Sequence, residues 1–170
     1  MKDFGRKSFN LATANRQLKW VYTFFLVFVL IGLLTNVAYG LFRIGLGYSA
    51  VAGYYRGAEQ GMQFGKEFGE LLNTSHFHAY IQGVMFLILT HLYAGTQASD
   101  GVKAAVVTVA FVSSVGDIVT PWLVRYLSTA FAPLMPLWWT GLLLSYLAII
   151  LSSLSAMWWT APGAAHGGPR

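Results

Sequence analysis

The sequence has no cysteine and few charged residues, and each shortage excludes a class of protein. Of its 170 residues, 10% are charged, whereas 56% are hydrophobic and 16% are aromatic. A soluble domain usually carries about 25% charged residues, so this chain cannot cover itself with the surface that a water-soluble enzyme needs. Its apolar fraction is also far too high for a disordered chain. The composition therefore predicts an integral membrane protein.

The absence of cysteine also narrows the cofactor chemistry. Without thiols the chain cannot form disulfides, iron–sulfur clusters, thiolate metal sites or the covalent links of c-type haem. The net charge of +5 could suggest a nucleic-acid partner, but the basic residues stand at the ends of apolar segments, as in membrane orientation. We therefore expect membrane lipid and other membrane subunits as partners, and no nucleic acid.

Four apolar segments are long enough to cross a bilayer, which takes about 20 residues in a helix. They cover residues 20–42, 76–95, 104–127 and 134–159. Short links make neighbouring spans antiparallel, so the sequence predicts an all-α, up-and-down bundle of four transmembrane helices within residues 20–160. A basic segment, residues 1–19, precedes it, and a flexible tail, residues 161–170, follows. The first apolar run is longer than the apolar region of a signal peptide, and the basic segment before it is long, so we expect it to be retained.

The basic residues predict the orientation. Five of them precede the first span, where Asp3 is the only acid: Lys2, Arg6, Lys7, Arg16 and Lys19. By the positive-inside rule, both ends of this multi-pass chain lie on the cytoplasmic side of a bacterial inner membrane. The tryptophans fall at predicted helix ends, where they mark the two membrane interfaces.

The outer loop, residues 45–75, is the one sizeable part expected outside the bilayer. Apolar residues recur at helical spacing between Phe64 and Leu72, which predicts a separate short amphipathic helix on the membrane surface. The polar residues Asn73–Ser75 would then cap the second span.

Three histidines lie on the second span, His76 and His78 near its outer end and His91 near its cytoplasmic end. Histidines at opposite ends of one helix are typical of b-type cytochromes, where each ligates one of two haems. No other span contains a histidine. The second haem ligands would therefore be Met157 for His91 and Met135 for the outer histidines, or would come from another subunit. The alternative is that the histidines make polar contacts in the bundle.

His76 and His78 also form an H-x-H pair near two glutamates, and such groups can bind zinc, copper or non-haem iron. On a regular helix, however, residues two apart diverge by about 200°. A shared metal ion therefore requires the helix to begin after this pair.

The third span carries a carboxylate, Asp117, deep in its apolar segment. Pro121 predicts a kink one turn later, and Trp122, Arg125 and Tyr126 follow. Such a group is a candidate quinone or proton site, because quinone carbonyls need a donor and a protonatable partner in an apolar pocket. The alternative is that Asp117 and Arg125 only tether the helices.

Five short motifs run along most of the chain: Y-Y-R-G (Tyr54–Gly57), K-E-F-G-E-L (Lys66–Leu71), S-H-F-H (Ser75–His78), T-H-L-Y-A (Thr90–Ala94) and G-D-I-V-T-P-W-L-V-R-Y (Gly116–Tyr126). The chain resembles, in these motifs, a family of small bacterial four-span membrane proteins associated with respiratory cytochromes. The resemblance implies that the histidines and the Asp117–Tyr126 segment belong to a recurring pattern.

Together these features favour a non-catalytic membrane subunit of a respiratory or electron-transfer complex, with haem b and quinone as candidate cofactors. We expect no enzymatic activity from the chain alone, because too little of it lies outside the bilayer to form a redox domain. The alternatives are a structural or assembly subunit without a cofactor, and a small transporter. The transporter is disfavoured because the sequence has no inverted repeats and no series of intramembrane charges.

Overall fold

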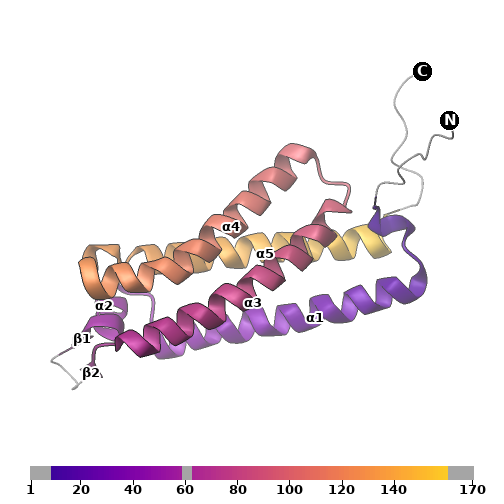
Figure 1. Cartoon of the computed structure of the whole chain (residues 1–170). Helices are drawn as coiled ribbons and strands as arrows, with labels where there is room; N and C mark the ends of the chain where they lie inside the picture. The colour runs from indigo at the N-terminus through magenta and orange to yellow at the C-terminus, as the bar shows by residue number, and fades with distance from the viewer. Residues whose placement is uncertain (1–8, 59–62, 161–170) are drawn as a thin grey trace, which may run out of the picture.

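The computed structural model describes residues 9–58 and 63–160, and long helices dominate this part of the chain (Figure 1). These helices are α1 (Arg16–Tyr39), α3 (Phe68–Ala94), α4 (Asp100–Trp122) and α5 (Leu134–Trp158). Two of them continue into π-helical turns, α1 into η2 (Gly40–Ile44) and α4 into η3 (Leu123–Leu127). Each of the four is long and apolar enough to cross a membrane. The predicted all-α architecture with four membrane-spanning helices is confirmed.

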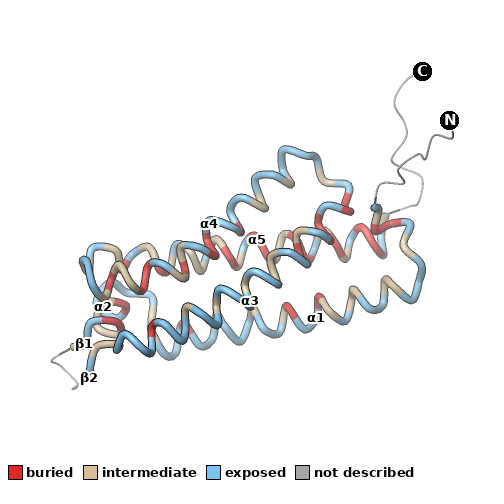
Figure 2. The backbone as a smooth tube through the Cα atoms, viewed as in Figure 1, coloured by how far each residue is buried: buried red, intermediate tan, exposed pale blue. Residues whose placement is uncertain are grey.

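Helix α5 lies at the centre of the bundle and packs against α1, α3 and α4. Figure 2 shows buried positions along most of α5, whereas α1 is largely exposed. The main apolar core fills the half of the bundle near the chain termini and includes Leu26, Leu89, Leu92, Tyr93, Ala110, Ile149, Ile150 and Met157. Many large apolar side chains point outward, as expected where lipid rather than water surrounds the helices.

Helices α4 and α5 approach each other closely at two glycines. Gly141 on α5 lies against the hydroxyl of Ser113, and Gly116 on α4 lies under the indole ring of Trp138. A Cβ atom at either glycine would meet these neighbours at less than ordinary contact distance. Small residues of this kind allow tight helix packing in membranes, where association depends on packing rather than on the hydrophobic effect.

The start of α1 and the end of α5 lie at the same end of the bundle, which we call the terminal end (Figure 1). At this end, two lysine side chains donate hydrogen bonds to backbone carbonyls near the ends of helices. The Lys19 ammonium donates to the Met157 carbonyl at 2.6 Å, and the Lys103 ammonium donates to the carbonyls of Ala94 and Thr96 at 3.0 and 2.8 Å. A positive charge at a helix C-terminus interacts favourably with the helix dipole, so these lysines stabilise α3 and α5 where they end.

The opposite, outer end is covered by a small folded unit, residues 45–58 and 63–67, which we call the outer cap. It consists of α2 (Tyr48–Arg56) and a two-stranded antiparallel hairpin of β1 (Gly57–Ala58) and β2 (Gln63–Phe64). Gly57 enters the hairpin at a φ of +94°, a conformation that favours glycine because it has no Cβ.

The prediction of a separate surface helix within the loop 45–75 is wrong. Phe68 and Leu72 lie in the first turns of α3, which begins at Phe68 instead of residue 76. The reason is a capping box: the Glu70 side chain accepts from the Glu67 N–H at 3.1 Å, and the Glu67 side chain accepts in turn from the helix. This box satisfies N–H groups that the first turn leaves free, so the helix starts there.

The other predicted span boundaries differ from the helix ends by a few residues. A kink was predicted at Pro121. The structure keeps this proline inside α4, and the π-helical turn η3 begins two residues after it. The predicted tail, residues 161–170, and the first eight residues of the basic segment lie outside the described part of the chain.

Candidate functional site

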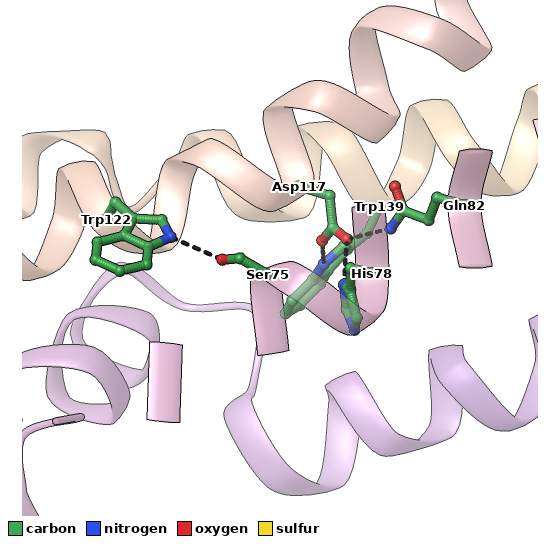
Figure 3. Close-up of polar contacts among 6 residues, drawn as sticks. All are labelled: Ser75, His78, Gln82, Asp117, Trp122 and Trp139. Atoms are coloured by element: carbon green, nitrogen blue, oxygen red, sulfur yellow. Dashed lines mark hydrogen bonds and ion pairs between the residues drawn. The ribbon is translucent and has the colours of Figure 1, made fainter. Parts of the chain in front are cut away.

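The most polar place within the described helices surrounds Asp117 on α4 (Figure 3). Its carboxylate is 6% exposed and meets three nitrogen atoms from two other helices. His78 Nδ1 lies 3.2 Å from Oδ2, Gln82 Nε2 donates to Oδ2 at 2.8 Å, and Trp139 Nε1 donates to Oδ1 at 2.9 Å. We call these four residues the Asp117 cluster.

Helical geometry brings the cluster together. His78 lies ten residues from the start of α3 at Phe68, and Asp117 lies ten residues from the end of η3 at Leu127. Both are therefore about 15 Å from the outer end of their helices. Gln82 follows His78 by four residues and so lies on the same face of α3. Helix α5 adds Trp139 from the third side.

An ionised carboxylate at this depth is costly unless it is well solvated by the protein. A carboxylate offers only acceptor atoms, and the three nitrogens converge on it as donors. Hydrogen bonds to a charged group are shorter and stronger than neutral ones. The cluster thus supplies the solvation that water would otherwise provide for Asp117.

The contact with Asp117 also sets the chemistry of His78. With Nδ1–H directed at the carboxylate, a neutral imidazole keeps its lone pair on Nε2. The His78 side chain is 35% exposed, and no described residue forms a hydrogen bond with Nε2. His78 Nε2 is therefore free to accept a hydrogen bond from a ligand.

The outer cap contributes a buried phenol, Tyr55, which is 7% exposed and packs in the apolar cluster beneath the cap. Burial raises the pKa of the Tyr55 phenol above its usual range, and the negative charge of nearby Asp117 raises this pKa further. Tyr55 therefore remains a neutral hydroxyl beside the carboxylate at all ordinary pH values.

Three residues predicted to share the Asp117 site, Trp122, Arg125 and Tyr126, make their contacts elsewhere. Trp122 Nε1 donates to Ser75 Oγ at 2.7 Å, and its ring stacks on Tyr126 at 5.9 Å between centroids. Arg125 Nη1 donates to the Arg56 carbonyl at 3.2 Å. Their partners lie at the junction of η3 with the cap and the start of α3, so the structure does not bring them to the carboxylate.

The predicted haem ligands are not paired within this chain. His76 and His91 are exposed, and the His91 ring stacks on Phe9 at 5.0 Å. Met135 and Met157 are 1% and 2% exposed, each packed in a separate apolar cluster. In this arrangement, a haem on His76 or His91 would take its second ligand either from another subunit or from a methionine that is now packed in an apolar cluster.

A metal ion shared by His76 and His78 is not supported either. Because α3 begins at Phe68, both residues lie inside a regular helix and face different directions. Within residues 9–58 and 63–160, no three histidine, aspartate or glutamate side chains gather as a metal site.

Sequence reasoning did not identify Gln82 and Trp139. The spacing of Gln82 could have identified it, because it lies one helical turn after His78 and is the polar residue on that face of the helix. Trp139 was interpreted as a marker of the membrane interface, and nothing in its neighbourhood in the sequence indicates an aspartate partner. Conversely, His78 was predicted as a haem or metal ligand, whereas the structure pairs it with Asp117.

Comparison with known proteins places the chain in a family. No curated protein and no solved structure matches it. A family model described as a transmembrane helical domain matches residues 45–163. The match covers the outer cap, α3, α4, α5 and all four residues of the Asp117 cluster, and it begins after α1. The chain therefore belongs to this family of transmembrane helical domains.

Proposed function

We propose that this chain is a membrane subunit of a quinone-linked electron-transfer complex, and that His78 and Asp117 form its quinol-binding and proton-accepting site. One observation carries the proposal: a half-exposed imidazole is held by a buried carboxylate at membrane depth. The respiratory setting is supported by the resemblance of the sequence motifs to a family associated with respiratory cytochromes.

The chemistry assigns a role to each residue of the cluster. A quinol hydroxyl donates a hydrogen bond to His78 Nε2. One proton moves to this nitrogen for each electron that leaves for a redox centre in a partner subunit, and the imidazolium releases that proton to solvent before the next transfer. Asp117 stabilises the resulting imidazolium. Gln82 and Trp139 hold the carboxylate in place through hydrogen bonds of 2.8 and 2.9 Å. The chain itself contributes binding and proton transfer, and no electron carrier.

Binding of the reduced form, decylubiquinol, to the purified protein in mild detergent tests the proposal, with quenching of tryptophan fluorescence as the readout. His78→Asn is the sharpest variant, because the shorter amide can still reach Asp117 but lacks Nε2. We expect His78→Asn and Asp117→Asn to weaken binding at least tenfold, since a hydrogen bond to a charged group contributes about 1.5–3 kcal/mol. The matched control is Asp100→Asn, at the other end of α4, which should bind like the wild type. Equal affinity of all three variants would rule out this site.

A structural subunit is the second candidate, and the three hydrogen bonds that Asp117 receives favour it. Under this alternative, Asp117 ties α3, α4 and α5 together and binds nothing. The two candidates differ in their response to His78→Asn. A structural role predicts a variant with an intact fold and no functional defect in the assembled complex, whereas the quinone site predicts an intact fold that has lost quinone binding.

Two further measurements address the complex. Purification from native membranes in gentle detergent, followed by mass spectrometry, identifies the partner subunits. A reduced-minus-oxidised visible spectrum of the same sample tests for haem b, including a haem that His91 would share with another subunit.

We propose a bacterial inner-membrane location with both termini in the cytoplasm, because the basic residues concentrate at the terminal end. The chain lacks cysteine, so single cysteines can report the side. Ser49→Cys in the outer cap should react with a membrane-impermeant maleimide in spheroplasts. Ser99→Cys, between α3 and α4, should react only after the membrane is permeabilised. The reverse pattern would overturn the orientation.

A further inference from the structure

A second set of polar atoms lies directly beneath the Asp117 cluster, toward the terminal end. It consists of Gln82 Oε1, Ser114 Oγ and the Tyr146 hydroxyl, and all three atoms are buried without a hydrogen-bond partner among the described residues. Ser114 and Tyr146 are 7% and 8% exposed. We call these three residues the lower polar layer.

Their positions along the helices place these three residues at a similar level of the bundle. Ser114 lies one turn before Asp117 on the same face of α4, and Gln82 lies one turn beyond His78 on α3. Tyr146 follows Trp139 by two turns on α5, but a helical side chain leans toward the helix N-terminus. Its hydroxyl therefore reaches back toward the cluster, and it lies near both Ser114 and Asp117, although no well-formed hydrogen bond joins Tyr146 to Ser114.

Three such atoms would destabilise a membrane protein if they stayed unsatisfied, since each has lost the hydrogen bonds that water would give it. Gln82 already uses its amide N–H on Asp117, so its oxygen still needs a donor. The two hydroxyl groups can each donate and accept. A buried water typically forms about three hydrogen bonds, and the layer offers three polar groups.

We propose that the lower polar layer is a binding site for water, held by Gln82, Ser114 and Tyr146 directly beneath Asp117. This inference does not depend on quinone binding. The water completes the hydrogen bonding of the layer and gives Asp117 a polar neighbour on its inner side. The site is closed below by fully buried apolar residues, Leu89, Ala110 and Ile149, so the water is confined to the level of the cluster.

A sodium ion is the other small ligand that such oxygen atoms could suggest, and the donors argue against it. The Asp117 carboxylate already faces the N–H groups of Trp139 and Gln82 and the imidazole of His78. A cation beside these donors would meet their positive ends. Water, which both donates and accepts, suits the layer better.

The test compares the hydroxyl groups of the lower polar layer with the hydroxyl of Ser153, a buried serine outside it that also lacks a hydrogen-bond partner among the described residues. Ser114→Ala and Tyr146→Phe remove hydroxyls from the layer, whereas Ser153→Ala removes a hydroxyl that is 0% exposed and lies among apolar residues two turns further along α5. Water needs two to four polar partners, so we expect Ser153 to be dry. Unfolding is followed in dodecyl maltoside by titration with sodium dodecyl sulfate.

If water is bound, Ser114→Ala and Tyr146→Phe each increase the unfolding constant about fivefold, as expected for the loss of one net hydrogen bond, and Ser153→Ala does not increase it. Infrared bands of internal water, recorded in ²H₂O, should disappear in the double variant. If the layer is dry, both variants are at least as stable as the wild type and the bands are unchanged, which would overturn the proposal. If sodium chloride stabilises the protein more than choline chloride does, the layer binds a cation instead of water, and the proposal is overturned.

Discussion

Two neighbouring tryptophans on α5 provide a direct test of the charge on Asp117. Trp139 Nε1 donates to Asp117 Oδ1 at 2.9 Å, and Trp138 Nε1 donates to the Thr120 hydroxyl at the same distance. Replacing either tryptophan by phenylalanine removes one indole N–H and a similar apolar area. The two variants therefore differ chiefly in whether the lost partner is a carboxylate or a hydroxyl.

The magnitudes follow from this difference. A hydrogen bond to a charged group contributes about 1.5–3 kcal/mol, and a neutral one about 0.5–1.5 kcal/mol. We therefore expect Trp139→Phe to lower the free energy of unfolding by about 1–1.5 kcal/mol more than Trp138→Phe, as measured by sodium dodecyl sulfate titration in mixed micelles.

A double-mutant cycle makes this test specific. In an Asp117→Asn background the acceptor is neutral, so the cost of Trp139→Phe should fall to that of Trp138→Phe, while the cost of Trp138→Phe itself stays the same. Equal costs of the two single variants, or a cost of Trp139→Phe that is independent of Asp117, would refute the idea that an ionised carboxylate organises the three helices.

Two further predictions concern packing and the outer cap. Gly141→Ala places a methyl group against Ser113 and should destabilise the bundle by about 1–3 kcal/mol. Gly83→Ala, with nothing within 4 Å, should be neutral or stabilise α3 by up to about 1 kcal/mol; equal effects in the same titration would contradict the close approach of α4 and α5. The pKa of Tyr55 lies above its ordinary value of 10.0 in the folded state. Its contribution to stability is therefore present below about pH 10 and is lost as the pH rises further. Tyr55→Phe should reduce this alkaline loss of stability in unfolding curves from pH 8 to 11, and an unchanged pH profile would show that Tyr55 is not buried.

The sequence by itself determined that the chain is a four-span helical membrane protein. Spanning depends on apolar length, and about 20 consecutive apolar residues satisfy it whatever the neighbouring helices do. The depth of single residues followed in the same way from counting along each helix. Asp117 was recognised as a polar residue within the apolar segment, and this is where the candidate site lies.

Only the tertiary structure decided which polar residues meet. The rotation of each helix about its axis depends on side-chain packing between helices, including the contact of Gly116 with Trp138, and sequence periodicity is weak where lipid makes every face apolar. Packing therefore turned His78 toward Asp117 and left His91 exposed. It also brought in Trp139 from a helix whose sequence contains no sign of that contact, because a partner across a helix interface leaves no spacing pattern along the chain.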